Sequence, residues 1–529
     1  MHGRVKVRTS EEEKARKEKE RQEKLKIFKH AMQKIQSKRK EGELDLEIFN
    51  ITGKVLNSNP DLYTLWNIRR EYINVFRKTC ENTEEITKLF DDELQMTEYC
   101  LKINPKSYCA WHQREWVLTT RMDPDWKKEL ALCTNYLQYD ERNFHTWDYR
   151  RFVVSQSKHS LEDEFNYTTD KIHENFSNYS AWHWRSKLLI ELYPDLEGGR
   201  PIRDSNHKHE LKIVQSAAFT DPDDTSAWFY QRWLLGAVKT DIHIAVCALT
   251  KSKSTFAFNK YVSKPYIQSS VKLIINNDNI SGDWASCTGN DYDTLWILNH
   301  SFAIVEDLDV KVEYSPINNE KKVIKCKQYK PSTYVGKTSI DFQKKYSIPV
   351  IEELKEQLKA CRQLLALEPD SKWTMFTTTV FLYCIDAKLY HKEIIDNLKA
   401  LKDIDKLRAG YFNDLITKWS IEQQLPVDYD KEELSFKPAL PEKMSCLPHL
   451  ALYSHCEDVD LSNQSLSAQH LKSLVVLQHC KKLSLAYNNI TSLKNWPSLT
   501  VEELDLQGNM INKDEVEQLR KQSNINIFF

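Results

Sequence analysis

Glycine is scarce in this chain. The sequence has 11 glycines among 529 residues, which is about 2%, whereas ~7% is usual for proteins. So few glycines argue against glycine-rich loops that hold phosphates or dinucleotides, and against a mainly β chain built on tight turns. Only Gly3, Gly42 and Gly53 fall within residues 1–197. We therefore expect that stretch to be helical.

Other absences exclude whole classes of protein. The chain has 75 Lys and Arg against 76 Asp and Glu, so no overall charge draws it to nucleic acid or to an anionic membrane. No apolar run approaches 18 residues and no apolar segment follows the N-terminus, which argues against a membrane span and a signal peptide. The 12 cysteines form no C-x-x-C pair, as zinc ribbons would require. We expect a reduced, cytoplasmic protein that is not a membrane protein and binds no nucleic acid.

A tryptophan pattern recurs along the first half of the chain. Successive copies are spaced by 45, 36, 35 and 46 residues, a basic period of about 35 with insertions, as in helical-repeat proteins. Proline or an Asn/Asp cluster precedes each tryptophan and breaks the helix before it. A weaker sixth copy surrounds Trp373. The five clear copies are NPDLYTLWNIRREY, NPKSYCAWHQREWV, DERNFHTWDYRRFV, NFSNYSAWHWRSKL and DPDDTSAWFYQRWL, with Trp66, Trp111, Trp147, Trp182 and Trp228.

An arginine follows the tryptophan three residues later in four copies, which places both side chains on one helix face. We expect the tryptophan to lie in the core and the arginine to pair with an acid or with carbonyls of a neighbouring helix. In the fifth copy the arginine comes one residue later, at Arg232. Amphipathic stretches such as 126–139 and 161–176 lie between the copies, so each repeat is expected to be a helical hairpin. The four regular arginines are Arg69, Arg114, Arg150 and Arg185.

Two later segments follow β patterns. Residues 241–349 contain alternating strands at 271–275 and 310–314 and Asn/Asp-rich turns, which predicts an inserted antiparallel β-sandwich of immunoglobulin-like size. Residues 441–529 contain the leucine-rich pattern L-x-L-x-x-N-x-I, with Asn488 and Asn509 at the asparagine position and Gln464 in an earlier copy. Three copies make a barely stable array, so this segment is expected to pack on the rest of the chain.

The chain as a whole is predicted to be mainly α: a right-handed α-solenoid of helical hairpins with two β additions. Residues 1–240 hold an N-terminal helix and repeats one to five, and 241–349 the immunoglobulin-like sandwich. Residues 350–440 hold the sixth repeat and closing helices, and 441–529 the leucine-rich repeats.

The W-x-x-R repeat after a P/N-x-x-Y-type lead resembles the repeats of protein prenyltransferase α subunits. The β insert, the leucine-rich tail and the start MHGRVKV are similar to the Rab geranylgeranyltransferase (type II) branch of that family. The resemblance implies an α/β heterodimer that transfers geranylgeranyl from geranylgeranyl diphosphate to C-terminal cysteines of Rab GTPases. It also implies that an escort protein presents the Rab, and that the β subunit holds the catalytic zinc and the isoprenoid pocket.

The resemblance also suggests site residues. Lys106 and Arg142 occupy the same position in adjacent repeats, and in the family a cation at this position of the third repeat approaches the diphosphate. Farnesyl relatives have lysine where this chain has Arg142, a change that keeps the charge but alters the geometry. The alternative is that both are solvent-facing residues at the start of a helix.

Four further residues are candidates from the same resemblance. Tyr108, Phe144 and Tyr179 precede their tryptophans by three residues, a position that in the family faces the β subunit; packing in the repeat core is the alternative. His2 is a candidate ligand of the partner's zinc, because an imidazole is a competent ligand; an unstructured tail is the alternative.

Two other functions remain open from the sequence. A non-enzymatic, tetratricopeptide-like scaffold would carry glycine and alanine where its helices cross, and glycine is nearly absent from these repeats. The α subunit of farnesyltransferase or type I geranylgeranyltransferase would lack the β insert and the leucine-rich tail.

Overall fold

The computed structural model describes residues 11–197, 200–238, 241–251, 253–316 and 321–529. The chain divides into two compact units, residues 1–192 (unit 1) and 193–529 (unit 2). No helix in the described ranges is both long enough and apolar enough to cross a bilayer.

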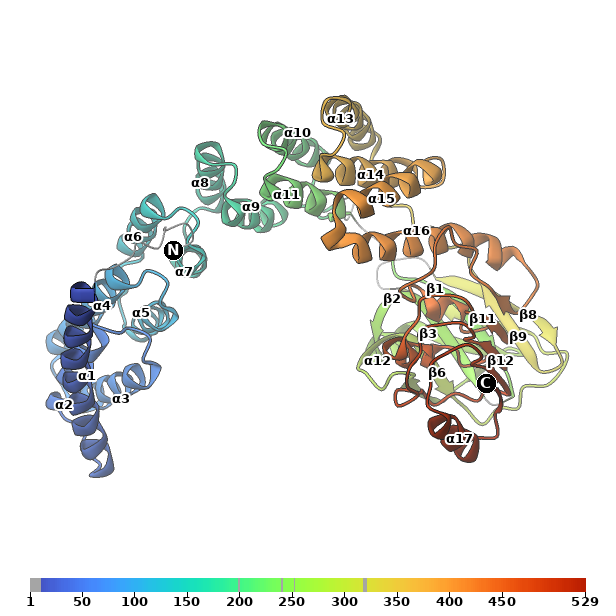
Figure 1. Ribbon diagram of the computed structural model, residues 1–529, viewed down its shortest axis with the longest axis horizontal. Coiled ribbons are helices and arrows are strands. Elements are labelled where there is room, and N and C mark those ends of the chain that lie inside the picture. The colour runs from blue at the N-terminus through green and yellow to red at the C-terminus, as the bar shows by residue number, and fades with distance from the viewer. Residues whose placement is uncertain (1–10, 198–199, 239–240, 252, 317–320) are drawn as a thin grey trace. The chain divides into compact units, whose positions relative to one another are not determined.

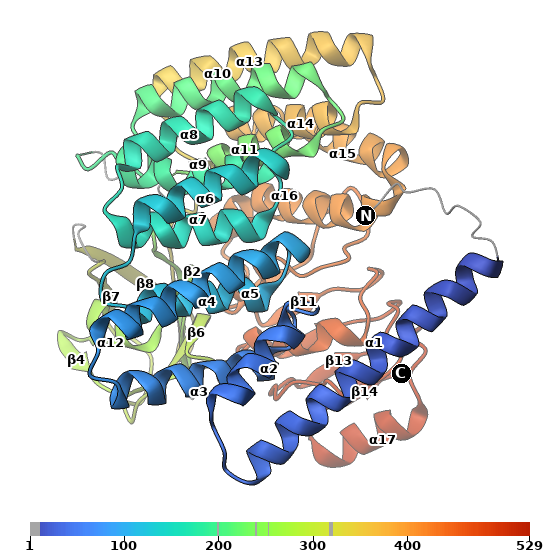
Figure 2. The same ribbon diagram turned by 90° about the vertical axis from the view of Figure 1, so that its left-hand side faces the viewer.

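The described part of unit 1, residues 11–192, contains helices and turns and no strand, as the scarcity of glycine predicted. After the long helix α1, four antiparallel hairpins pair α2 with α3, α4 with α5, α6 with α7, and α8 with α9. Figure 2 shows these hairpins layered one on the next. The helices are α1 (Glu11–Lys40), α2 (Leu46–Leu56), α3 (Tyr63–Thr79), α4 (Thr83–Ile103), α5 (Tyr108–Thr120), α6 (Trp126–Tyr139), α7 (Phe144–Ser157), α8 (Leu161–Glu174) and α9 (Tyr179–Leu192).

The repeat tryptophans lie in the core, as predicted. Trp66, Trp147, Trp182 and Trp228 are at most 1% exposed and Trp111 is 5% exposed. Most helices of unit 1 begin after an Asn, Asp or Ser whose side chain accepts a backbone N–H of the first turn, which satisfies an otherwise unpaired donor. These capping residues are Asp45, Asn82, Ser107, Asp125, Asn143 and Ser160.

Three of the repeat arginines join consecutive hairpins through buried acids. The guanidinium of Arg114 forms two 2.7 Å hydrogen bonds with Glu129 on the following hairpin and donates at 2.8 Å to the Leu94 carbonyl. Both predicted kinds of partner, an acid and a carbonyl, are therefore present. Arg69 pairs with Glu93 and Arg150 with Glu164 in the same way. A buried pair of this kind is strongly destabilising to break, because the remaining charge stays out of water.

Arg232, which comes one residue late in the fifth copy, does not belong to this set. The residue three positions after Trp228 is Gln231, and its amide donates at 3.0 Å to Gln357, which in turn donates to Glu353. A chain of amides therefore replaces the guanidinium–carboxylate pair in the fifth repeat, and Arg232 lies on another face of its helix.

Unit 2 has helical hairpins of its own, and the β insert separates α11 from α13 along the sequence (Figure 1). Helices α10 and α11 contact α13 and α14, so the insert leaves the stack of hairpins unbroken. The sixth copy is confirmed as a hairpin, with Trp373 7% exposed at the start of α14. The helices are α10 (Asp204–Thr220), α11 (Thr225–Gly236), α13 (Ile348–Leu367), α14 (Lys372–Asp386), α15 (His391–Ile404) and α16 (Ala409–Asp430), with a 3₁₀ turn at Lys406–Arg408.

The β insert is one antiparallel sheet of nine strands in the order β4-β3-β7-β8-β9-β1-β2-β6-β5. The two strands expected from the sequence, β3 and β7, pair with each other along their whole length. The sheet is curled, so that side chains from both halves share one core; an immunoglobulin sandwich would instead have two separate sheets. The strands are β1 (Ile244–Leu249), β2 (Ser254–Ser263), β3 (Val271–Ile275), β4 (Asp278–Ile280), β5 (Asp283–Ser286), β6 (Tyr292–Asn299), β7 (Val310–Tyr314), β8 (Lys322–Lys330) and β9 (Thr333–Lys337), with a short helix α12 (Lys264–Ser270).

The leucine-rich segment forms a parallel ladder. Asn509 Oδ1 accepts the N–H of Ile490, and its amide donates to the carbonyls of Leu485 and Leu506. Asn488 makes the equivalent bonds one repeat earlier, as predicted for this position. The strands are β10 (Ser435–Phe436), β11 (Asp458–Asp460), β12 (Lys482–Ser484), β13 (Glu503–Asp505) and β14 (Asn526–Phe528), with 3₁₀ helices at Leu450–Tyr453 and Ala468–Val476 and helix α17 at Lys513–Gln522.

The leucine-rich segment and the curled sheet share one hydrophobic core. Val246 and Ala257 of the sheet cluster with Leu452 and Val459 of the leucine-rich segment and with Leu425 of α16. The expectation that the tail packs on the rest of the chain is therefore confirmed, and the surface it packs on is the outer face of the curled sheet.

Candidate functional site

The turns between hairpins of unit 1 share one construction, and together they form a surface that we call the repeat edge (residues 59–63, 104–108, 140–144 and 175–179). In each turn an Asn or Asp side chain accepts the backbone N–H two residues later, as Asn104 does from Lys106 and Asp140 from Arg142. The following residues begin the tryptophan-bearing helix. This local bonding fixes the backbone of the turn.

The indole N–H of each repeat tryptophan holds its turn in place. Trp111 Nε1 donates at 2.9 Å to the carbonyl of Pro105, six residues earlier, and the equivalent bond recurs in the other clear repeats. The same Pro105 carbonyl accepts the side-chain amide of Asn143, which caps the next tryptophan-bearing helix. Each of the first three turns of the repeat edge is therefore fixed both to its own helix and to the next repeat.

The structure places Lys106 and Arg142 at equivalent points of two adjacent turns, and both side chains are exposed. Lys106 Nζ lies 3.6 Å from Asp140 Oδ2, and this pair is open to solvent. A solvent-exposed pair is weak, so the ammonium group remains available to an anion. The sequence reasoning missed Asp140, although its place at the head of DERNFHTW marks it as the residue that initiates the turn.

The three aromatic candidates are exposed. Tyr108 is 68%, Tyr179 is 55% and Phe144 is 49% exposed, so none is a core residue of this chain. The rings of Tyr108 and Phe144 lie 6.4 Å apart. Tyr63, 66% exposed, holds the same position in the first repeat and was not singled out from the sequence. A row of exposed aromatic rings of this kind is typical of a protein–protein interface.

His145 lies beneath this row. Its ring is 6% exposed and contacts Tyr108 and Phe144, with ring centroids 4.3 and 4.0 Å away. Burial, together with the positive charge of Lys106, lowers the pKa of His145 below its usual value. A neutral imidazole therefore supports the two rings.

The metal-ligand candidate from the sequence, His2, lies outside the described residues. Within the ranges that the structure describes, no group of three His, Cys, Asp or Glu side chains is placed to hold a metal ion.

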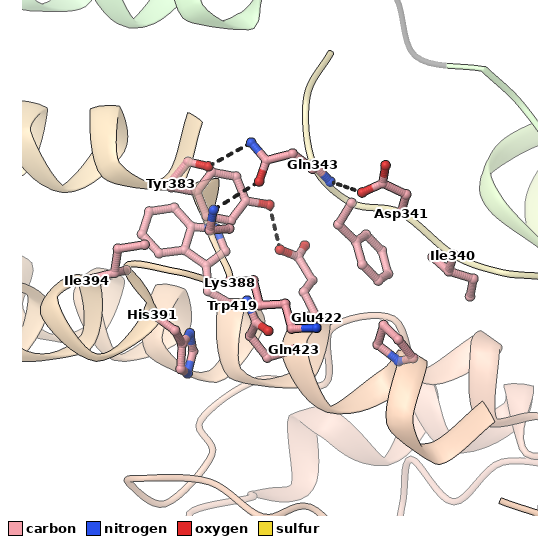
Figure 3. A pocket seen from close by; sticks show the side chains of 13 residues that line it. Ile340, Asp341, Gln343, Tyr383, Lys388, His391, Ile394, Trp419, Glu422 and Gln423 are labelled. Atoms are coloured by element: carbon pink, nitrogen blue, oxygen red, sulfur yellow. Dashed lines mark hydrogen bonds between the residues drawn. The ribbon is translucent and has the colours of Figure 1, made fainter. Parts of the chain in front are cut away.

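Unit 2 contains a small cavity of about 140 Å³ between α14, α15, α16 and the segment that leads from β9 to α13. Figure 3 shows the Tyr383 hydroxyl directed at the Glu422 carboxylate, to which it donates a 2.7 Å hydrogen bond. The other carboxylate oxygen of Glu422 lies 2.8 Å from His449 Nε2. The Gln343 side chain bonds the backbone at the end of α14. These polar groups already form hydrogen bonds within the chain. We therefore interpret the cavity as a packing gap between elements of unit 2.

Comparison with known proteins agrees with this architecture. The model of the protein prenyltransferase alpha subunit repeat matches residues 90–121, 126–157, 161–192 and 207–238. The "Geranylgeranyl transferase type-2 subunit alpha" of Rattus norvegicus is 34% identical over 97% of this chain and 92% of the relative. The protein of the same name from Homo sapiens is 34% identical over 98% of this chain and 93% of the relative. This chain belongs to the family of type-2 geranylgeranyl transferase alpha subunits.

Members of this family differ in length. The protein of the same name from Dictyostelium discoideum is 38% identical over 242 residues, which are 45% of this chain and 76% of that relative. That relative is therefore far shorter than this chain. Among solved structures, a Candida albicans protein geranylgeranyltransferase-I complexed with GGPP is similar, with a TM-score of 0.43 and 16% identity over 74% of this chain and 89% of that chain.

Proposed function

We propose that this chain is the α subunit of a heterodimeric, cytoplasmic Rab geranylgeranyltransferase. The heterodimer transfers geranylgeranyl from geranylgeranyl diphosphate to C-terminal cysteines of Rab GTPases, which an escort protein presents. The catalytic zinc and the isoprenoid pocket belong to the β subunit. The observation that carries this proposal is the similarity to type-2 alpha subunits along nearly the whole chain.

The geometry of the repeat edge supports the division of work between the subunits. Its exposed aromatic row, Tyr63, Tyr108, Phe144 and Tyr179, suits the surface that the β subunit covers. Lys106 and Arg142 lie on the same edge and carry positive charge toward solvent. In the heterodimer these cations face the diphosphate leaving group, where a fixed positive charge stabilises the transition state.

The chemistry needs groups that this chain does not supply by itself. A zinc-bound thiolate is the nucleophile when the metal is bound in the partner, and the described residues contain no candidate zinc site. This chain contributes the surface on which the partner assembles and cations that face the departing diphosphate.

The experiment is a transfer assay with purified components. Geranylgeranyl incorporation into a Rab is measured with this chain alone, with the β subunit added, and with both the β subunit and escort protein. We expect no transfer by the chain alone and transfer by the complete mixture. Activity of the chain alone, or failure to form a heterodimer, would contradict the proposal.

A further inference from the structure

Asp61 occupies the position in the first turn of the repeat edge that Lys106 and Arg142 occupy in the next two turns. In the first two turns, the side chain at this position reaches the residue that begins the following turn. The carboxylate of Asp61 accepts the side-chain amide of Asn104 at 2.9 Å. The ammonium group of Lys106 lies 3.6 Å from the carboxylate of Asp140. The first turn therefore has an acid where the next two have cations, and this acid contacts the turn that carries Lys106.

Asp61 holds the residues on both sides of Lys106. One of its carboxylate oxygens accepts the Asn104 amide, and the other accepts the hydroxyl of Ser107 at 2.6 Å. Ser107 is fully buried and caps the tryptophan-bearing helix by accepting the N–H of Ala110. Asn104 in turn accepts the backbone N–H of Lys106 at 3.1 Å. The backbone from which the Lys106 side chain extends is therefore fixed by the neighbouring repeat.

The charge of Asp61 decides which way the Asn104 amide faces. An ionised carboxylate only accepts hydrogen bonds, so Asn104 must turn its NH₂ group toward Asp61 and its oxygen toward the N–H of Lys106. In Asp61→Asn, the side-chain oxygen still accepts the Ser107 hydroxyl, and an NH₂ group then faces Asn104. Either two donors oppose each other, or the Asn104 amide turns over and gives up the N–H of Lys106.

We propose that Asp61 is a positioning residue for Lys106, an inference that rests on the proposed role of Lys106 beside the departing diphosphate. Asp61 acts through Asn104 and Ser107, because a carboxylate would itself repel the diphosphate. A cation helps the transition state most from a fixed place, and a misplacement of about 1 Å can cost about 100-fold in rate. The ammonium group of Lys106 is carried on a flexible four-carbon side chain, so a fixed backbone limits the positions that it visits.

The test measures single-turnover geranylgeranyl transfer by the heterodimer with saturating Rab–escort complex. Asp61→Asn should lower the rate constant about three- to fivefold, less than the roughly tenfold loss expected for Lys106→Ala. Added to Lys106→Ala, the same change should have no further effect, because no ammonium group remains to be positioned. The matched control is Asp125→Asn at the cap of α6, at the far end of that helix from the repeat edge. It should transfer as wild type does.

A double exchange separates positioning from stability. In Asp61→Asn with Asn104→Asp, donor and acceptor trade places, and the new carboxylate has a second oxygen for the N–H of Lys106. Asp140 already bonds the N–H of Arg142 in this way one turn later, so a carboxylate fits at this point of the turn. The double exchange should restore the wild-type rate constant. Asn104→Asp alone places two carboxylates against each other and should be slow.

The outcomes distinguish the inference from the proposed function. If the wild-type heterodimer transfers nothing, or if Lys106→Ala transfers at the wild-type rate, the proposed function or its cation fails and the inference fails with it. If Lys106→Ala is slow and Asp61→Asn transfers at the wild-type rate, only the inference is wrong. It is also wrong if Asp61→Asn slows Lys106→Ala as much as it slows wild type, or if the double exchange restores the melting temperature but not the rate constant. In both cases Asp61 only holds the repeats together.

Discussion

The ammonium group of Lys106 lies 3.6 Å from one oxygen of the Asp140 carboxylate, and the other oxygen accepts the backbone N–H of Arg142. One acidic side chain therefore links the two cations that are the candidates for contact with the diphosphate. Because Asp140 and Lys106 are both exposed, their attraction is weak and easily replaced by that of a stronger anion.

The first prediction concerns this group of three residues. Negative charge gathers on the departing diphosphate as its bond to carbon stretches, so a nearby cation helps the transition state more than the ground state. Lys106→Ala or Arg142→Ala should lower the single-turnover rate constant roughly tenfold, less than the loss at a closed oxyanion site. Asp140→Asn removes the competing carboxylate and should transfer at least as fast as wild type.

Single-turnover rates with saturating Rab–escort complex measure this effect, and the melting temperature of each heterodimer shows that assembly is intact. Lys102→Ala, one turn away on α4, is the matched control. If Lys106→Ala and Arg142→Ala both transfer at the wild-type rate, these residues are surface residues of the repeats and the partner alone holds the diphosphate.

The second prediction concerns the buried pair of Arg114 and Glu129. Arg114→Met leaves Glu129 buried without its guanidinium and should lower the free energy of unfolding by about 3–5 kcal/mol. The double change Arg114→Met with Glu129→Met should recover most of this loss, since no uncompensated charge remains. Arg121→Met breaks a pair with Asp91, whose side chain is 60% exposed, and should cost less than about 1 kcal/mol.

Urea unfolding of wild type, Arg114→Met, Glu129→Met and the double variant provides the measurement, evaluated as a double-mutant cycle, with Arg121→Met as the exposed-pair control. If Arg114→Met and Arg121→Met lower the free energy of unfolding equally, the buried ion pair does not hold the repeats together and apolar packing does.

Much of this architecture follows from short-range sequence patterns. The tryptophan and the helix breaker before it identify each hairpin, because both act within one or two turns of the chain. Strands β3 and β7 could also be predicted, because the alternation of apolar and polar residues lies within each strand. The sequence did not show that Gln231, at the regular arginine position of the fifth copy, bonds with Gln357, because that contact joins residues 126 positions apart.

The same limit applies to the site. The repeat spacing was sufficient to place Lys106 and Arg142 in equivalent turns and to align Tyr108 with Phe144. It could not show that Asp140 pairs with Lys106, since this contact joins two repeats through side chains. Nor could it show that the leucine-rich segment and the curled sheet share one core, which depends on packing between residues some 200 positions apart.

The third prediction concerns pH and two buried histidines of the leucine-rich segment. Burial, aided by the nearby cation Lys253, lowers the pKa of His479 to about 4. Burial, aided by Lys337, lowers the pKa of His455 to about 3. In the unfolded chain both titrate near pH 6.5. Above pH 6.5 these histidines are unprotonated in both the folded and the unfolded chain. Below it the unfolded chain binds more protons than the folded chain. The free energy of unfolding should therefore fall by about 2 kcal/mol per histidine between pH 7 and pH 5.

His479→Asn should remove one histidine's share of this pH dependence. His30→Asn, at an exposed position of α1, should leave the pH dependence unchanged. Urea unfolding of each variant at pH 7 and pH 5 provides the comparison. If the free energy of unfolding falls as much between pH 7 and pH 5 in His479→Asn as in wild type, His479 is already protonated in the folded chain.

The last prediction concerns the two β additions. Because Val246 and Ala257 of the curled sheet pack in the same core as Leu452 and Val459, removing residues 441–529 alone uncovers an apolar face of the sheet. That variant should aggregate. Removing 241–349 and 441–529 together, with a short flexible linker between α11 and α13, takes away the sheet and most of the leucine-rich segment, and leaves only the smaller part of the shared core on α16 and β10. Since α10 and α11 contact α13 and α14 directly, the hairpins stay stacked, and the much shorter Dictyostelium relative is consistent with such a form. The double deletion should therefore stay monodisperse in size-exclusion chromatography and still co-purify with the β subunit.

The control is deletion of the hairpin α6–α7, which carries Arg142 and Phe144 on the repeat edge and should abolish co-purification. If the double deletion aggregates while the single deletion of 441–529 stays monodisperse, the sheet does not need the leucine-rich segment to cover it.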